Sequence, residues 1–227
     1  MLVSIALFSC SFVLLWIGSG LAVDGITKIA RSLKLSSFFV SFFILGLFTS
    51  ITEIMVGVNA VLEKTPEIFV GNLLGSSVVV LLLIVPLFAV LANGVSLNHS
   101  FQFKDLVSAV VVIGFPALLS LDNRISVIDA LVCMVMYVYF LYIQEKKNNS
   151  FGRLITVSIK KSTIYLNLAK ILLAVILVFV ASNILVNQTS TVAELLGVSP
   201  FLISILIISV GTNLPEIAIG ARAILDK

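Results

Sequence analysis

The chain has 227 residues and a mass of 24.4 kDa, and 60% of its residues are hydrophobic whereas only 11% are charged. Soluble globular domains carry about 25% charged residues, so this composition excludes a soluble globule and predicts a membrane protein. The formal net charge of +3 is too small to indicate a nucleic-acid partner. The expected surroundings are therefore a lipid bilayer, and protein partners are left open.

Cysteine and histidine chemistry is not expected. Cys10 and Cys133 lie in separate apolar runs, so we interpret them as packing residues rather than as a disulfide framework or a zinc site. The single histidine, His99, lies between apolar runs, and no H-E-x-x-H zinc motif occurs. An intramembrane enzyme and a bound cofactor are therefore not predicted.

Apolar windows of about 20 residues, the length that crosses a bilayer, recur along the whole chain. They predict seven transmembrane helices at residues 2–23, 36–62, 68–92, 105–121, 125–144, 166–187 and 200–224. The first run has neither a preceding basic residue nor an obvious cleavage site, so we interpret it as a span rather than a signal peptide. Gly114 and Pro116 predict a bend in the fourth span, or a tight hairpin with the fifth.

The distribution of lysine and arginine favours a count of seven. With the N-terminus outside, 12 of the 14 basic residues fall on the cytoplasmic side, and only Lys64 and Arg124 fall on the other. The sequence thus predicts an integral protein of the plasma (inner) membrane with an external N-terminus and a cytoplasmic C-terminus. Residues 145–163 would form a basic cytoplasmic connector, for which a topology signal is favoured over a lipid-binding role.

An internal repeat emerges at an offset of 163 residues, which places residues 35–64 on residues 198–227. Eleven of the thirty positions are then identical, including a threonine pair and the pair Glu53 and Glu216. The offset matches the first predicted helix with the sixth, so the repeat unit has five helices. Because five is odd, consecutive copies would cross the membrane in opposite directions.

The repeat also predicts the domain organisation of an all-α membrane bundle. Residues 1–144 would form the first five-helix copy, 145–163 the connector, and 164–227 the first two helices of the second copy. Three helices of the second copy are missing from this arrangement. The sequence therefore suggests a truncated reading frame, a fragment, or a chain that a partner completes.

Two acidic residues, Glu53 and Glu216, lie well inside predicted spans. A carboxylate at bilayer depth is costly unless it faces water or a cation, so a functional role is favoured over two protonated packing residues. Pro215 lacks an N–H group and crowds the carbonyl of Gly211, which predicts a kink that exposes carbonyl oxygens. Oxygen ligands without His or Cys favour Ca²⁺, Na⁺ or similar ions. Two carboxylates would balance one Ca²⁺, with protons or monovalent ions as competitors.

A third polar segment, GNLLGSS at residues 71–77, lies early in the third predicted span. Gly71 and Gly75 are four residues apart and favour close helix packing, so packing by small residues is the competing interpretation. The asparagine and the serines of this segment would direct polar groups into the bundle.

Together, GTNLPE at residues 211–216, TSITE at 49–53 and GNLLGSS resemble the paired signature segments of the cation/Ca²⁺ exchanger superfamily, the sodium/calcium exchanger membrane region. The resemblance implies an antiporter that exchanges Ca²⁺ for Na⁺ or H⁺ by alternating access between two inverted five-helix repeats. It implies Glu53 and Glu216 as the central cation ligands. The assisting ligands that it implies are Thr49, Ser50, Ser76, Thr212 and Asn213.

The chain departs from the family pattern at four positions. Phe48 stands where Gly is expected, Thr52 where Pro is expected, Ser77 where Asn is expected, and Val80 where a further oxygen ligand is usual. Without the proline, the sequence leaves open whether the helix of the first copy is interrupted. The alternative function is a truncated or decayed membrane protein that does not transport, or one that needs a partner chain to complete its site.

Overall fold

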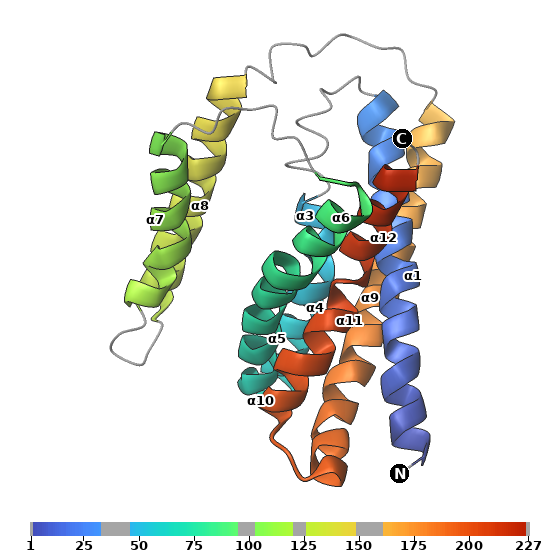
Figure 1. Cartoon of the computed structure of the whole chain (residues 1–227). Helices are drawn as coiled ribbons and strands as arrows, with labels where there is room; N and C mark the ends of the chain where they lie inside the picture. The colour runs from blue at the N-terminus through green and yellow to red at the C-terminus, as the bar shows by residue number, and fades with distance from the viewer. Residues whose placement is uncertain (1, 33–45, 95–102, 120–125, 149–160, 226–227) are drawn as a thin grey trace. The chain divides into compact units, whose positions relative to one another are not determined.

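The computed structural model describes residues 2–32, 46–94, 103–119, 126–148 and 161–225. Every regular element in these ranges is helical, so the predicted all-α class is confirmed. The chain divides into two compact units, one of Met1–Val95 with Ile155–Lys227 and the other of Ser96–Leu154. Figure 1 draws the helices of both units.

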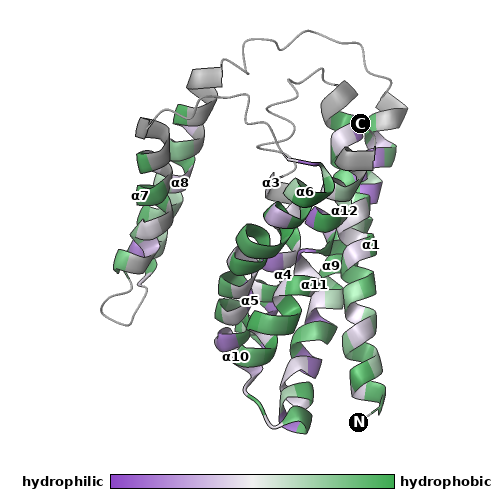
Figure 2. Cartoon of the chain, in the orientation of Figure 1, coloured by the Kyte–Doolittle hydropathy of each residue, from purple (hydrophilic) through white to green (hydrophobic). Residues whose placement is uncertain are grey.

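Several helical runs have the composition of membrane spans, and Figure 2 shows hydrophobic residues predominating along them. Four runs in the described part of the chain are long and apolar enough to cross a membrane: Leu2–Ile29, Pro66–Leu91, Ile164–Leu196 and Pro200–Ala218. Shorter apolar helices cover Ile51–Leu62 and Val127–Phe140. The count of seven stays a prediction, because residues 36–45 of the second predicted span lie outside the described residues.

Two long helices of the larger unit pack along each other: α1 (Leu2–Ser32) and α9 (Lys161–Leu196). Gly18 of α1 lies against Val178, whereas Gly25 lies against Ile171, so the two helices run in opposite directions. A Cβ atom on Gly18 would come within 2.7 Å of the Val178 side chain, which shows how closely the helices approach. Both helices extend past their predicted spans, because polar residues continue a helix without lengthening its apolar window.

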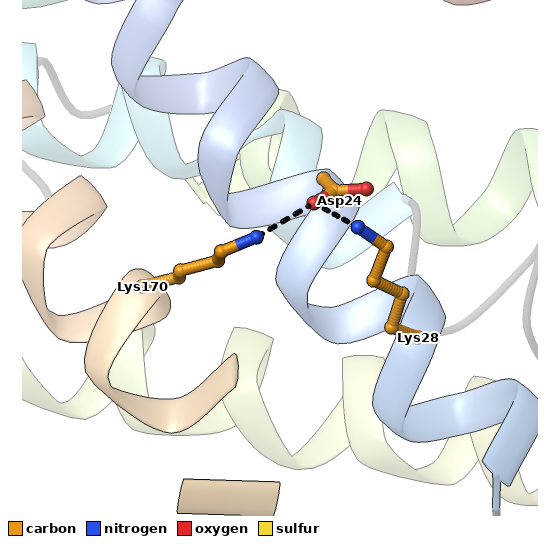
Figure 3. Close-up of polar contacts among 3 residues, drawn as sticks. All are labelled: Asp24, Lys28 and Lys170. Atoms are coloured by element: carbon orange, nitrogen blue, oxygen red, sulfur yellow. Dashed lines mark hydrogen bonds and ion pairs between the residues drawn. The ribbon is translucent and has the colours of Figure 1, made fainter. Parts of the chain in front are cut away.

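An ion pair shared by three side chains also joins α1 to α9 (Figure 3). The Lys28 Nζ atom lies 2.8 Å from Asp24 Oδ2, and the Lys170 Nζ atom of α9 lies 3.6 Å from the same oxygen. All three side chains are partly exposed, so the pairs contribute about 1 kcal/mol at most. Their effect is to favour one register of α1 on α9. The sequence had indicated Lys28 and Lys170 as topology signals alone.

A sharp reversal follows α9. Gly197 adopts a φ of +68°, the left-handed conformation that closes a helix C-terminus. The Ser199 hydroxyl then accepts the Leu202 N–H at 3.2 Å and caps the next helix, with Pro200 in its first turn. That run consists of α10 (Pro200–Ile203), the π-helical η5 (Ser204–Ile208), α11 (Ser209–Thr212) and α12 (Leu214–Leu225).

A second interrupted run precedes α9 in the chain. It consists of α3 (Gly46–Thr49), α4 (Ile51–Leu62), α5 (Pro66–Val78), the π-helical η2 (Val79–Ile84) and α6 (Val85–Leu91). Lys64, with a φ of +57°, forms the tight turn between α4 and α5. In a regular helix the ring of Pro86 would crowd the carbonyl of Leu82, and the π-helical turn of η2 relieves this contact.

The two runs break at equivalent positions. Ser50 separates α3 from α4, and Asn213 separates α11 from α12. Their backbone angles are alike, with φ −73° and ψ 1° at Ser50 and φ −89° and ψ 5° at Asn213. The bounds of all four helices differ by the same 163-residue offset. The first copy is therefore interrupted even without proline, while the full five-helix inverted repeat stays a prediction.

Polar side chains join α4 to α9 along what we call the α4–α9 seam: Asn59, Glu63, Ser182, Asn183 and Asn187. The fully buried Asn59 amide nitrogen lies 2.7 Å from Ser182 Oγ and 2.9 Å from the Met55 carbonyl. Asn183 donates to Asn59 Oδ1 at 3.1 Å, and both Asn183 and Asn187 donate to Glu63 Oε1 at 3.3 Å. The seam therefore fixes α4, which carries Glu53 in its first turn, against α9.

The smaller unit is a helical hairpin of α7 (Phe103–Leu119) and α8 (Val127–Asn148). The Ser126 hydroxyl and backbone N–H both donate to Asp129 Oδ2, at 2.7 and 2.8 Å, and form a cap for α8. Pro116 lies inside α7 as expected, but residues 120–125 of the predicted turn are outside the described residues. The predicted domain boundaries stay predictions, because residues 149–160 of the connector are also outside them.

Replacing Asn59 with leucine is expected to weaken the α4–α9 seam. Interhelical hydrogen bonds in membranes average about 0.6 kcal/mol, so losing the Asn59 contacts should cost about 1–2 kcal/mol. Thermal unfolding of the purified chain in detergent measures the change. Val58→Leu, at an exposed position of the same helix, is the matched control and should leave the melting temperature unchanged. Equal melting temperatures for Asn59→Leu and the control would contradict a stabilising seam.

Candidate cation site

Glu53 and Glu216 lie in the first turns of α4 and α12, directly after the two helix breaks. Both side chains are partly buried, and their carboxylates lie close enough to interact electrostatically. The Thr49 side chain, which precedes the first break, also interacts with the carboxylate of Glu216. The two acidic residues predicted from the sequence therefore come together, although one belongs to each copy of the repeat.

The hydroxyl of Thr52 links the two breaks. Its Oγ1 atom lies 2.7 Å from Glu53 Oε2, 3.2 Å from the carbonyl oxygen of Thr49 and 3.2 Å from the carbonyl oxygen of Thr212. All three partners are acceptors, and a hydroxyl carries one proton, so the Thr52 proton leaves at least two of these oxygens without its hydrogen bond. Thr52 is fully buried, and its bond to the Thr49 carbonyl occupies an acceptor at the break that forms without proline.

Helix α5 adds two polar side chains to the same cluster. Thr212 Oγ1 lies 3.0 Å from Asn72 Oδ1 and 3.4 Å from Ser76 Oγ. Both α5 residues are buried, and they lie one turn apart on one face of the helix. The GNLLGSS segment thus contributes directly to the cluster.

The glycines of the same segment allow this contact. A Cβ atom on Gly71 would lie 2.8 Å from the Phe201 carbonyl oxygen, and one on Gly75 would lie 2.5 Å from the Ile205 carbonyl oxygen. Because both obstacles are backbone atoms, only glycine permits α5 to approach α10 and η5 so closely. GNLLGSS therefore has both predicted features: its glycines pack against α10 and η5, and its polar residues contact Thr212.

The remaining predicted residues differ in their surroundings. Asn213 is 2% exposed and donates from Nδ2 to the Ser209 carbonyl at 2.6 Å, whereas its counterpart Ser50 is exposed. Ser77 is also exposed and bonds to the Leu73 carbonyl of its own helix at 3.0 Å. Val80 is partly buried in η2 and offers no oxygen. The side chain of Phe48 lies outside the described residues.

Two buried polar atoms at this cluster have no hydrogen-bond partner: Asn72 Nδ2 and Glu216 Oε2. They are the only such side-chain atoms in the part of the chain that the structure describes. Asn72 contacts the Thr212 hydroxyl, and Glu216 lies in the first turn of the helix that follows Thr212. Buried polar groups are nearly always paired, so these two atoms mark a place where a ligand is expected.

The donor set suits a hard cation. No group of three or more His, Cys, Asp or Glu residues occurs close together in the described ranges, so a zinc or copper site has no support there. What the cluster offers is two carboxylates with hydroxyl, carbonyl and amide oxygens, the ligands that Ca²⁺ prefers. Na⁺ and protons would compete for the same two charges.

Sequence reasoning missed Thr52 and Asn72 as members of this cluster. Thr52 was noted only as a departure from proline, although a threonine next to a helix break can bond back to the carbonyl three residues earlier. Asn72 was noted as a polar group in the bundle without a partner. Its spacing of four from Ser76 was the available signal, because residues four apart share one helix face.

A model of the family described as sodium/calcium exchanger protein matches residues 3–145 and 166–227. The chain belongs to the sodium/calcium exchanger family. The match covers most of the chain, including both helix breaks and the GNLLGSS segment. Membership establishes an integral membrane protein of a transporter family and is consistent with the predicted calcium and sodium cargo.

Two relatives match most of the chain. An uncharacterized membrane protein of Methanocaldococcus jannaschii is 25% identical over 98% of this chain and 72% of its own length. CaxA of Alkalimonas amylolytica, whose name describes it as a candidate antiporter, is 27% identical over 89% of this chain and 66% of its own length. The chain therefore spans between two thirds and three quarters of these relatives.

Solved structures of the sodium-calcium exchanger NCX_Mj are also similar. One, soaked with 2.5 mM Na⁺ and 1 mM Sr²⁺, has a TM-score of 0.63 and 26% identity, covering 97% of this chain and 72% of the exchanger. Another, soaked with 10 mM Na⁺ and 10 mM Sr²⁺, has a TM-score of 0.64 and 26% identity, with coverages of 98% and 72%. This likeness confirms the helical membrane architecture.

Replacing Gly75 with alanine should separate α5 from η5, because the new methyl group would meet the Ile205 carbonyl and the Ser209 side chain. Overpacking of this kind costs about 1–3 kcal/mol. We expect a lower melting temperature together with weaker Ca²⁺ binding, measured by equilibrium dialysis. Gly20→Ala is the control, since nothing lies within 4 Å of its added methyl group. A Gly75→Ala chain that matches Gly20→Ala in both measurements would show that close packing of α5 is unimportant.

Proposed function

We propose that this chain is an integral-membrane cation antiporter that exchanges Ca²⁺ for Na⁺ or H⁺. The observation that carries the proposal is the meeting of Glu53 and Glu216, each placed by an equivalent helix break. Two carboxylates brought together inside a membrane protein, with only neutral polar neighbours, repel each other, so a divalent cation between them is strongly favoured. The predicted ligands Thr49, Ser50, Ser76, Thr212 and Asn213 belong to this proposal.

Ca²⁺ and the monovalent cations or protons compete for the same two carboxylate charges, and this competition couples their movements. One Ca²⁺ neutralises both carboxylates, and the same charge is balanced by two monovalent cations or by two protons. Ca²⁺ and its competitors therefore exclude each other from the site, which antiport requires. The antiparallel packing of α1 on α9 supports alternating access between inverted repeats, because equivalent helices would then offer the site to opposite faces.

The second candidate function is a family member that binds cations without transporting them, or one that needs a partner chain to transport. It is favoured by Val80, whose hydrocarbon side chain follows Ser76 by one turn and offers no ligand there. Binding and flux measurements separate the two functions. Ca²⁺ binding without Ca²⁺ movement would favour the second candidate.

Uptake of ⁴⁵Ca²⁺ into everted vesicles from cells expressing the chain tests the antiporter, with an outward Na⁺ gradient or an outward H⁺ gradient as the two arms. Glu53→Gln and Glu216→Gln each remove one of the two charges while keeping the side-chain shape. Affinity in oxygen-ligand sites depends on the number of charged ligands, so each change should lower uptake about tenfold or more.

Glu67→Gln is the matched control for these variants. Glu67 is an exposed residue in the first turn of α5, four residues after Glu63 and outside the cluster. Its neutralisation should leave uptake at the wild-type level. Uptake that survives both Glu53→Gln and Glu216→Gln would remove the two carboxylates from the transport mechanism.

A further inference from the structure

Asn72 is held where it can serve the transported cation directly. It is fully buried on α5, and its Oδ1 atom accepts a hydrogen bond from Thr212 Oγ1 at 3.0 Å. Its Nδ2 atom has no partner, although an amide nitrogen has two protons to donate. Leaving a buried donor unpaired is unfavourable, so this orientation of the amide is a poor one for the site.

Rotating the terminal amide of Asn72 exchanges the positions of its oxygen and nitrogen and removes the unpaired donor. Nδ2 then donates to Thr212 Oγ1, which is also an acceptor. The Thr212 hydroxyl keeps an acceptor for its own proton in the Ser209 carbonyl, at 3.3 Å. The amide nitrogen thus gains a hydrogen bond, and the Thr212 hydroxyl keeps an acceptor, without any movement of the backbone.

The same rotation leaves Oδ1 where the unpaired nitrogen had been, with no donor of the described chain to satisfy it. A buried carbonyl-type oxygen without a donor is a ligand for a hard cation. The other unpaired atom of the cluster, Glu216 Oε2, is an anionic oxygen that needs the same kind of partner. A cation bound in the cluster would meet this need at both atoms.

We propose that Asn72 is a cation ligand that turns its amide oxygen toward the bound ion and its amide nitrogen toward Thr212. This inference rests on the proposed function and adds a ligand to it from α5. It also explains how the site can lack an oxygen ligand at Val80. Asn72 supplies an amide oxygen two turns earlier, on the face of α5 that already reaches Thr212. The ligand class is a hard cation, with Ca²⁺ as the probe.

Three variants of the full chain test the assignment by equilibrium dialysis with ⁴⁵Ca²⁺ in detergent. Asn72→Leu keeps the branched shape of the side chain and removes both the oxygen and the donor, whereas Asn72→Asp keeps the oxygen and removes the donor. Ser77→Ala is the control, because Ser77 is exposed and bonds only to its own helix in the described contacts. Changes around a metal site commonly cost 10–100-fold in affinity, so the Leu variant should lose about tenfold or more.

The expected pattern is weak Ca²⁺ binding by the Leu variant and binding by the Asp variant that is within about threefold of wild type, or tighter. Wild-type binding by Asn72→Leu would overturn the assignment. Equal losses in the Leu and Asp variants would also overturn it, because they would mean that Asn72 acts through its N–H groups. Ser77→Ala should bind as the wild type does.

A spectroscopic measurement on the wild-type chain keeps the test decisive if the Leu variant does not fold. The side-chain NH₂ signals of ¹⁵N-asparagine-labelled protein are recorded during a Ca²⁺ titration, and the Asn72 pair is assigned by its absence in Asn72→Asp. Rotation of the amide predicts that this pair shifts with the same dissociation constant as Ca²⁺ binding. Signals that stay unchanged at saturating Ca²⁺ would contradict the proposal.

The Glu53→Gln and Glu216→Gln chains separate this inference from the proposed function. If they lose Ca²⁺ binding and Asn72→Leu keeps it, the assignment of Asn72 fails and the cation site formed by the two carboxylates stands. If the wild-type chain binds neither Ca²⁺ nor Na⁺, both proposals fail.

Discussion

The repulsion between two carboxylates inside a helical membrane protein is the constraint on which the site depends. Glu53 and Glu216 interact electrostatically, and the neighbours that surround them in the described contacts are hydroxyls, carbonyls and amides. Such neutral dipoles orient around a cation but do not supply positive charge. A hard cation meets both needs, because it neutralises the carboxylates and is coordinated by the remaining oxygens. The electrostatics of the fold therefore favour an occupied site.

The rest of the larger unit brings the two acidic side chains together. Each helix break places a glutamate in the first turn of a new helix, at the same position in both copies. Glycines of α5 let Asn72 and Ser76 reach Thr212 from the side, while the α4–α9 seam holds the helix that carries Glu53. These contacts come from three different helical runs. A site assembled in this way depends on helix packing as much as on its own residues.

The first helix break shows that different residues can produce the same backbone geometry. In the second copy Pro215 lacks an N–H group, whereas in the first copy Thr52 bonds back to the Thr49 carbonyl. The angles at Ser50 and Asn213 are nevertheless similar. Thr52 stands where the second copy has proline, and its hydroxyl also contacts the Thr212 carbonyl at the opposite break. The departure from the family pattern thus adds a polar contact between the two copies.

The amino-acid sequence alone determined the helical membrane class and the family, and it predicted the two acidic residues of the proposed site. These follow from local properties: apolar windows of bilayer length, and a threonine and glutamate that recur at one offset. Only the tertiary structure decided that Thr52 bridges the breaks, that Asn72 lies on Thr212, and that Asn59 bonds to Ser182. Those contacts join residues more than a hundred positions apart. They depend on the rotation and spacing of packed helices, which neither composition nor periodicity specifies.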